Sequence, residues 1–241
     1  MNTLLPLALT FAIGGGQEPA ETPTSLISKM VRVHYDAQTT QGTIISRQSV
    51  KNFTVTTKTE VAIDRPARIR IAQTRDGSEA RTWLAVADSD KFSYDRPPGV
   101  NGRPRFVEPQ FQKGRFLDTR EVYMVVGPSL GDKSPVLDIL IGRTDDLRLL
   151  RQTWGTQWEI VGKVKIREQE CTVIRGSYEP APLAGQIGQL EMVISPTFQL
   201  MRYTTGQKVV LPESKELVLI RTEWDVDVRL NGEIDPKLFA G

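Results

Sequence analysis

Nucleophilic or metal chemistry needs several His, Cys, Asp or Glu side chains that converge, and this chain of 241 residues has one histidine and one cysteine. His34 stands beside Tyr35 in a segment with helical periodicity, where we expect a packing or surface role. Cys171 lies in a strand-like run, and a free cysteine there acts as a small buried hydrophobe more often than as a reagent. The sequence therefore predicts no catalytic residue, no metal site and no cofactor.

Pairs of carboxylates are the remaining route to catalysis, because two of them in one pocket can hydrolyse a glycosidic bond. Asp145 and Asp146 are adjacent, and adjacent residues on a helix do not face each other. Asp225 and Asp227 alternate with Trp224 and Val226, which places them on the solvated side of a strand. A hydrolase stays as a third hypothesis that requires two carboxylates converging in one pocket.

Fixed charge is nearly balanced, with 31 Lys and Arg against 29 Asp and Glu, and the basic residues are scattered through strand-like segments. Proteins that bind nucleic acid gather their cations in a run or patch. The composition therefore predicts no nucleic-acid partner. An apolar fraction of 39% with 25% charged residues is that of a globular protein with a sizeable core.

The start of the chain has the order of a secretory signal peptide: a short apolar run, small residues at Gly14 and Gly16, and then polar residues from Gln17. The run is too short to span a bilayer as a helix. It lacks an opening Lys or Arg, so an apolar tail or a misplaced start codon is the alternative. We expect a signal peptide over residues 1–16, a polar linker over 17–24, and a periplasmic or secreted product that does not span a membrane.

Two hydrophobic periods divide the rest. Ser25–Gln38 has apolar residues at spacings of three and four, typical of an amphipathic helix capped by Thr24 or Ser25. From Gly42 onward the period is two, which is typical of strands with one apolar face. The middle of the chain differs, since residues 120–126 and 135–141 are short apolar segments of helical character.

Alternation over about nine strands predicts a mainly β protein with some α structure, built as one curved antiparallel sheet with helices over its inner face. Residues 25–241 would form this single domain, with a helical insertion around residues 106–150. Arg65 ends a strand immediately before Pro66, so it should lie at the rim of the sheet. There its side chain would reach either a helix-terminal carbonyl or a ligand.

Two stretches at opposite ends of the chain carry a family resemblance. The first is Ile63-Asp-Arg-Pro-Ala-Arg-Ile-Arg70, followed by Trp83-Leu-Ala-Val-Ala-Asp-Ser-Asp-Lys-Phe-Ser-Tyr-Asp95. The second is Ser195-Pro-Thr-Phe-Gln-Leu200 with Val228-Arg-Leu-Asn-Gly-Glu-Ile-Asp-Pro-Lys-Leu-Phe239. Both resemble the periplasmic outer-membrane lipoprotein carriers, the LolA/LolB-like family. The sequence departs from that pattern at the turn glycine, which is Ser89 or Asp90, at Arg96, and in a longer middle segment.

The resemblance implies an incomplete antiparallel β barrel, a half-barrel, covered by an N-terminal helix and short lid helices. In that family the concave face takes up acyl chains, and the arginine of the Arg-Pro motif, here Arg65, contacts the lid. Relatives with the same shell act as stress-sensing regulators (RseB-like) or as glycolipid-binding lipoproteins, and fold analogy does not choose among these roles.

The first hypothesis is therefore an exported, non-enzymatic carrier that shelters lipid or lipoprotein acyl chains and acts as a monomer. The second is an envelope sensory or interaction module that docks to a protein partner, which an exposed apolar patch outside the barrel would favour. An interior filled by the chain's own side chains is the alternative to an open cavity. The expected cavity residues, with Arg65 at the rim, are Phe53, Val55, Val61, Ile69, Ile71, Trp83, Leu190, Met192 and Trp224.

Overall fold

The computed structural model describes residues 21–76, 81–88, 91–95, 118–127, 130–132, 134–141, 157–178, 188–210 and 214–240. The expected signal peptide over residues 1–16 lies outside this part of the chain, as do portions of the expected linker and of the helical insertion. The helices are α1 (Pro23–Asp36), α2 (Thr119–Val126), α3 (Pro135–Ile141) and a short 3-10 helix, η3 (Pro236–Phe239). The strands are β1 (Thr39–Val50), β2 (Phe53–Asp64), β3 (Arg68–Arg75), β4 (Arg81–Asp88), β5 (Lys91–Asp95), β6 (Gln157–Ile166), β7 (Gln169–Tyr178), β8 (Gly188–Ile194), β9 (Leu200–Val210) and β10 (Leu217–Leu230).

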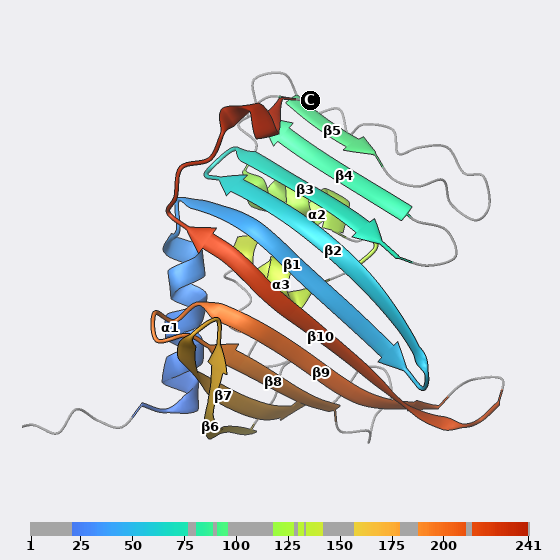
Figure 1. The fold of residues 1–241 in the computed structure, drawn as a ribbon. Helices are drawn as coiled ribbons and strands as arrows, with labels where there is room; N and C mark the ends of the chain where they lie inside the picture. Colours follow the sequence, from blue (N-terminus) through green and yellow to red (C-terminus); the bar gives the residue numbers. More distant parts are fainter. Residues whose placement is uncertain are drawn as a thin grey trace, which may run out of the picture.

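All ten strands belong to one antiparallel sheet in the order β5-β4-β3-β2-β1-β10-β9-β8-β7-β6 (Figure 1). The first and last strands of the chain are therefore neighbours at the middle of the sheet, and β5 and β6 lie at its two edges. Within the described residues these two edges do not pair, so the sheet is curved but open. The predicted mainly β architecture, an open half-barrel with helices, is confirmed.

The close approach of β1 and β10 explains one glycine. Gly42 is paired with Val228, and a Cβ atom at Gly42 would lie 2.0 Å from the carbonyl oxygen of Asp227. No side chain tolerates that contact. Glycine is therefore needed here so that the two central strands can lie at their observed distance.

Helix α1 begins and ends two residues earlier than the sequence predicted. Pro23 occupies the first turn, where its missing N–H would have had no intrahelical partner. The backbone N–H of Ser25 donates to Thr22 Oγ1 at 3.2 Å, so Thr22, and not Thr24 or Ser25, is the cap. At the other end the backbone N–H of Gln38 donates to Asn231 Oδ1 at 2.8 Å, so Gln38 belongs to the connection between α1 and β1 and not to the helix.

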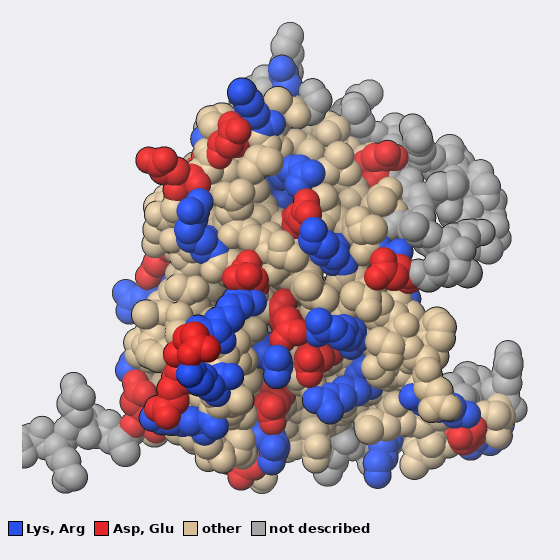
Figure 2. Space-filling model, viewed as in Figure 1, with Lys and Arg blue, Asp and Glu red and all other residues tan. Residues whose placement is uncertain are grey.

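The register gives the two faces of the sheet different chemistry. Inner-face positions such as Ile44, Ile63 and Ile71 are fully buried under α1, α2 and α3. The outer face, viewed in Figure 2 from the side opposite α2 and α3, shows Lys, Arg, Asp and Glu interspersed over the strands. At its centre Asp225 accepts hydrogen bonds from Arg47 at 2.5 Å and Arg202 at 2.8 Å. The outer face of the central strands is thus a solvated, ion-paired surface.

The sheet bends back on its outer side at the β6–β7 end. Arg167, in the turn between these strands, donates to the carbonyl oxygen of Val226 at 3.0 Å and to Asp227 Oδ1 at 2.8 Å, although β8 and β9 lie between β7 and β10 in the sheet. A second, smaller apolar cluster lies in this region. Its members are Cys171, Val173, Val193 and Met201, with Ile166 packed against them.

Candidate functional site

The inner face of the sheet contains all nine residues that the sequence singled out for an apolar cavity. Seven of them are buried in the main apolar cluster. They are Val61, Ile69, Ile71, Trp83, Leu190, Met192 and Trp224. Phe53 and Val55 share the inner face of β2 with Val61, but they lie at the far end of the strand, where Phe53 is 65% exposed and Val55 is half-buried.

Most of the inner face is filled by the chain itself. Helix α1 contributes Leu26 and Met30 to the main cluster, α2 contributes Val122 and Val126, and α3 contributes Leu137, all of them buried. These side chains pack on the sheet where a ligand would otherwise lie. An apolar ligand can therefore occupy this face only by displacing part of the helical cover.

The first polar attachment of the cover is Arg65. This half-buried guanidinium donates three hydrogen bonds to carbonyl oxygens at helix ends: Ala37 at 2.8 Å, Leu140 at 2.8 Å and Ile141 at 2.9 Å. Burial lowers the pKa of Arg65 from its ordinary value, and Arg120 adds to that effect. Of the two roles considered for Arg65 from the sequence, contact with helix-terminal carbonyls is the one present here. The side chain joins the ends of α1 and α3 to the rim of β2.

The second polar attachment is Asp132, in the connection between α2 and α3, and it was not foreseen from the sequence. Trp224 Nε1 donates to Asp132 Oδ2 at 2.8 Å. Gln73 binds the backbone of Asp132 in both directions, because its Nε2 donates to the Asp132 carbonyl and its Oε1 accepts from the Asp132 N–H, each at 3.2 Å. Burial raises the pKa of Asp132, while hydrogen bonds from Trp224 and Ser46 oppose that rise.

Sequence carried little signal for this attachment because its partners are far apart along the chain. Asp132 follows Gly131, which alone would be interpreted as a turn. The reason for the glycine is steric, since a Cβ atom at Gly131 would lie 2.5 Å from the ring of Trp83. Trp83 and Trp224 thus meet the same connection, one by packing and one by donating a hydrogen bond.

A cavity of about 280 Å³ lies beside this attachment, where the cover ends on the inner face. Its lining includes Val55 and Thr57 of β2, Thr222 and Trp224 of β10, and Asp132. The same face continues beyond it to Phe53. Most of the lining is polar, since Ser46, Gln48 and Arg75 also contribute, and its apolar side chains are Val55 and Trp224.

His34 is a buried packing residue of α1. Its Nε2 accepts a hydrogen bond from the backbone N–H of Leu200 at 3.1 Å, and its Nδ1 has no hydrogen-bond partner among the described residues. Burial, with a smaller contribution from Arg65, lowers the pKa of His34 to about 4. The imidazole is neutral at pH 7 and links α1 to β9.

Within the described residues there is no group of three or more His, Cys, Asp and Glu side chains placed to hold a metal ion. None of the described helices has the length and apolarity needed to cross a membrane. Asp225 and Asp227, the strand pair considered for hydrolysis, lie on the outer face and are ion-paired with arginines. Asp145 and Asp146 lie outside the described residues.

No family model and no curated protein matches the chain. Among solved structures, the MucA/MucB complex of Pseudomonas aeruginosa matches with 10% identity and a TM-score of 0.45, over 91% of this chain and 61% of that one. Lipoprotein LppX of Mycobacterium tuberculosis matches with 9% identity and a TM-score of 0.37, over 88% of this chain and 96% of its own. A LolA superfamily protein of Nitrosomonas europaea matches with 12% identity and a TM-score of 0.29, over 91% and 98%.

This chain thus spans less than two thirds of the matched MucA/MucB chain, at 61% of its length. The three structures agree with the LolA- and RseB-like resemblance found in the sequence, at the level of fold. With TM-scores of 0.45 or lower they carry no argument about function, which rests on the geometry of this chain alone.

Proposed function

We propose that this protein binds the acyl chain of a lipid or lipoprotein between the inner face of its sheet and the α2–α3 cover. The observation that carries the proposal is how the cover is held. It consists of two helices of 8 and 7 residues that lie on an apolar face and carry polar attachments at Arg65 and Asp132. Helices this short have little stability of their own, so their position depends on the sheet beneath them.

Exchange of one apolar cover for another makes such binding energetically feasible. Sheltering an acyl chain contributes about 0.8 kcal/mol per CH₂ group. A chain that takes the place of Val122, Val126 or Leu137 would restore apolar contacts to the inner face of the sheet. Opening would release the donors of Arg65 and Trp224 and expose apolar side chains of the helices, so the bound chain must offset both costs.

The cavity of about 280 Å³ supplies the entry point in this proposal. Phe53 and Val55 extend the apolar inner face beyond the cover, where an acyl chain arriving from solvent would meet them first. No catalytic group or cofactor is required. The proposed setting is the periplasm or the exterior, with residues 25–241 as one domain released after removal of residues 1–16.

A direct test is to express the chain in a bacterial periplasm, purify it without detergent, and examine its organic extract by mass spectrometry. Binding of a fluorescent fatty acid is then measured for Val55→Glu and for its matched control Thr54→Glu. Val55 lies at the cavity, whereas Thr54 is exposed on the opposite face of the same strand. We expect tenfold or greater weakening for Val55→Glu and no change for Thr54→Glu.

An extract without lipid, together with no binding of the fluorescent fatty acid, would refute acyl-chain binding. Equal affinities for the two variants would refute the location. Circular dichroism checks that both variants fold. We expect them to fold, because a charge at a half-buried position is compatible with the native sheet.

The second candidate function is an interaction module that docks to an envelope protein. A specific observation favours it: Leu217 and Leu219 are exposed on the outer face of β10, outside the half-barrel. An apolar patch of this kind on an otherwise charged face is typical of a protein-binding surface.

A further inference from the structure

The start of β10 has an apolar sequence on both faces, but its side chains are buried on only one. Leu217, Val218, Leu219 and Ile220 are consecutive, and such runs are typical of strands buried on both sides. Val218, on the inner face, is only 4% exposed, whereas Leu217 is 54% and Leu219 is 57% exposed on the outer face. The outer-face side chains are therefore exposed where this sequence predicts burial.

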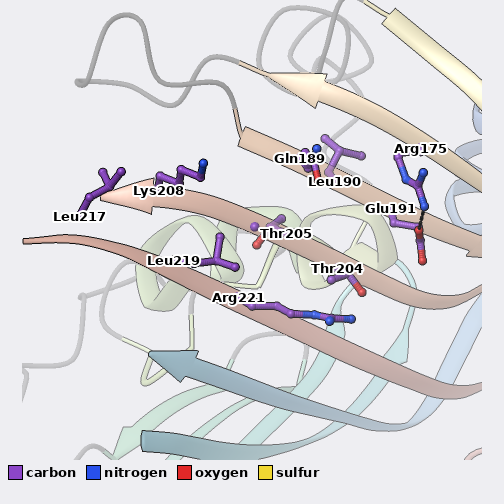
Figure 3. Close-up of a pocket in the computed structure, with 11 residues that line it drawn as sticks. Arg175, Gln189, Leu190, Glu191, Thr204, Thr205, Lys208, Leu217, Leu219 and Arg221 are labelled. Carbon is purple, nitrogen blue, oxygen red and sulfur yellow. Dashed lines mark hydrogen bonds and ion pairs between the residues drawn. The ribbon is translucent and has the colours of Figure 1, made fainter. Parts of the chain in front are cut away.

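These two leucines line a groove of about 980 Å³ that crosses the outer face between β7 and β10 (Figure 3). Strands β8 and β9 form the floor, with Gln189, Thr204 and Gly206 among the lining residues.

The groove has an excess of positive charge. Its lining includes the cations Arg175, Lys208 and Arg221 and one carboxylate, Glu191. Glu191 is engaged by Arg175 at 3.2 Å, the contact drawn as a dashed line in Figure 3. Lys208 forms no ion pair with any described residue. Arg221 approaches Glu223 at 3.4 Å but keeps 62% of its side chain exposed. Two cations are thus available to an anionic group.

The order of these side chains specifies what would fit. Leu217, Leu219 and Arg221 follow one another at alternate positions on the outer face of β10, and Lys208 lies opposite Leu219 in the register. From Leu217 to Arg221 an extended chain covers about 13 Å, at about 3.3 Å per residue. A complementary chain would present two apolar side chains and then a carboxylate, each two residues apart.

We propose that this groove docks an extended acidic segment of a partner protein, with apolar residues at two alternate positions and Asp or Glu at the next. This inference rests on the interaction module proposed above and names the location and chemistry of its partner. An acyl chain fits the groove less well, because the hydroxyl of Thr204 and the amide of Gln189 would lose water without gaining a hydrogen-bond partner. A peptide backbone supplies those partners.

The test uses the full chain and a displayed library of random heptapeptides. We expect selection to enrich peptides of the form apolar-x-apolar-x-acidic, or its reverse, and fluorescence anisotropy to measure their affinities. Leu219→Ser and Lys208→Glu should each weaken binding at least tenfold. Lys163→Glu, the control, changes an exposed lysine of β6 outside the groove and should leave the affinity unchanged. Replacing the acidic residue of the peptide by Lys should abolish binding.

Three results would overturn the proposal. One is a library without enrichment, or enriched peptides that bind Leu219→Ser and Lys208→Glu as well as the parent. Another is competition between the peptide and a fluorescent fatty acid, with fatty-acid binding that Lys208→Glu abolishes. That result would assign the groove to lipid. The third is concentration-dependent dimerisation that Leu219→Ser removes, which would assign it to a second copy. Fatty-acid binding that responds only to Val55→Glu leaves the acyl-chain function intact whatever the peptide result.

Discussion

On the inner face the chain buries its own isoleucines and tryptophans under three helices, whereas on the outer face of β10 it leaves two leucines in contact with water. Ile71 has no exposed surface, and Leu219 exposes 57% of its own, although both residues lie on strands of the same sheet. The inner face therefore contributes to folding, and any ligand there must compete with the chain's own side chains. The outer groove contributes little to folding, so its apolar residues are available for a partner.

Removal of one inner-face side chain should have the largest effect on stability. Ile71→Ala deletes a fully buried side chain in the main cluster and leaves a cavity. We expect a loss of about 4 kcal/mol in the free energy of unfolding. Urea denaturation followed by tryptophan fluorescence measures it. A loss below about 1 kcal/mol would mean that the helices repack over the gap, and the contrast between the faces would then be weaker than proposed.

Acid should weaken the covered region through His34. The pKa of this group is about 4 in the folded protein and 6.5 in the reference state, so the unfolded chain binds the extra proton. The stability due to neutral His34 is fully present above pH 6.5 and is lost as the pH falls through about 4. This pKa shift corresponds to a loss of about 3 kcal/mol in the free energy of unfolding.

Measurement of the unfolding free energy at pH 7, 5.5 and 4 tests this pH dependence. His34→Gln removes the titrating group while leaving an oxygen that can accept from the Leu200 N–H. We expect the variant to have a shallower slope over this range than the parent. Identical slopes would show that other groups control the acid response.

The alternation of apolar and polar residues made much of the fold predictable. Period two fixes which residues share a face, and Pro66 marks the end of a strand. Alternation does not show how far a cover extends. Phe53 has the same parity as Val61 on β2, yet it lies beyond the helices, because the position of α2 and α3 depends on contacts made far away in sequence.

The two features that sequence reasoning did not find both depend on long-range geometry. Asp132 and Trp224 are 92 residues apart, so no local pattern links them. The groove at Leu217 and Leu219 is lined by residues of four strands, from Arg175 on β7 to Arg221 on β10. Four consecutive apolar residues from Leu217 were visible in the sequence, but a fully buried strand would have looked the same.

Loss of the Asp132 attachment should have a moderate effect and separate the cover from the sheet beneath it. Asp132→Ala leaves the indole N–H of Trp224 without its acceptor, which should cost about 1–2 kcal/mol. Asp132→Asn keeps an oxygen acceptor and removes the cost of burying a charge, so its stability should stay close to that of the parent. Urea denaturation measures the stability of both variants, and the tryptophan emission maximum reports the change in the surroundings of Trp224. Equal losses for Ala and Asn would indicate that the negative charge, and not the acceptor, holds the connection.

The smallest effect is expected in the groove. Leu219→Ala removes a side chain that is 57% exposed and packs on little besides the floor near Gly206. We expect the unfolding free energy to change by no more than about 0.5 kcal/mol, as for most surface substitutions. The same variant should lose the proposed peptide binding. A stability loss near that of Ile71→Ala would show that Leu219 already has a structural partner in this chain, and the groove would then have no vacant apolar surface to offer.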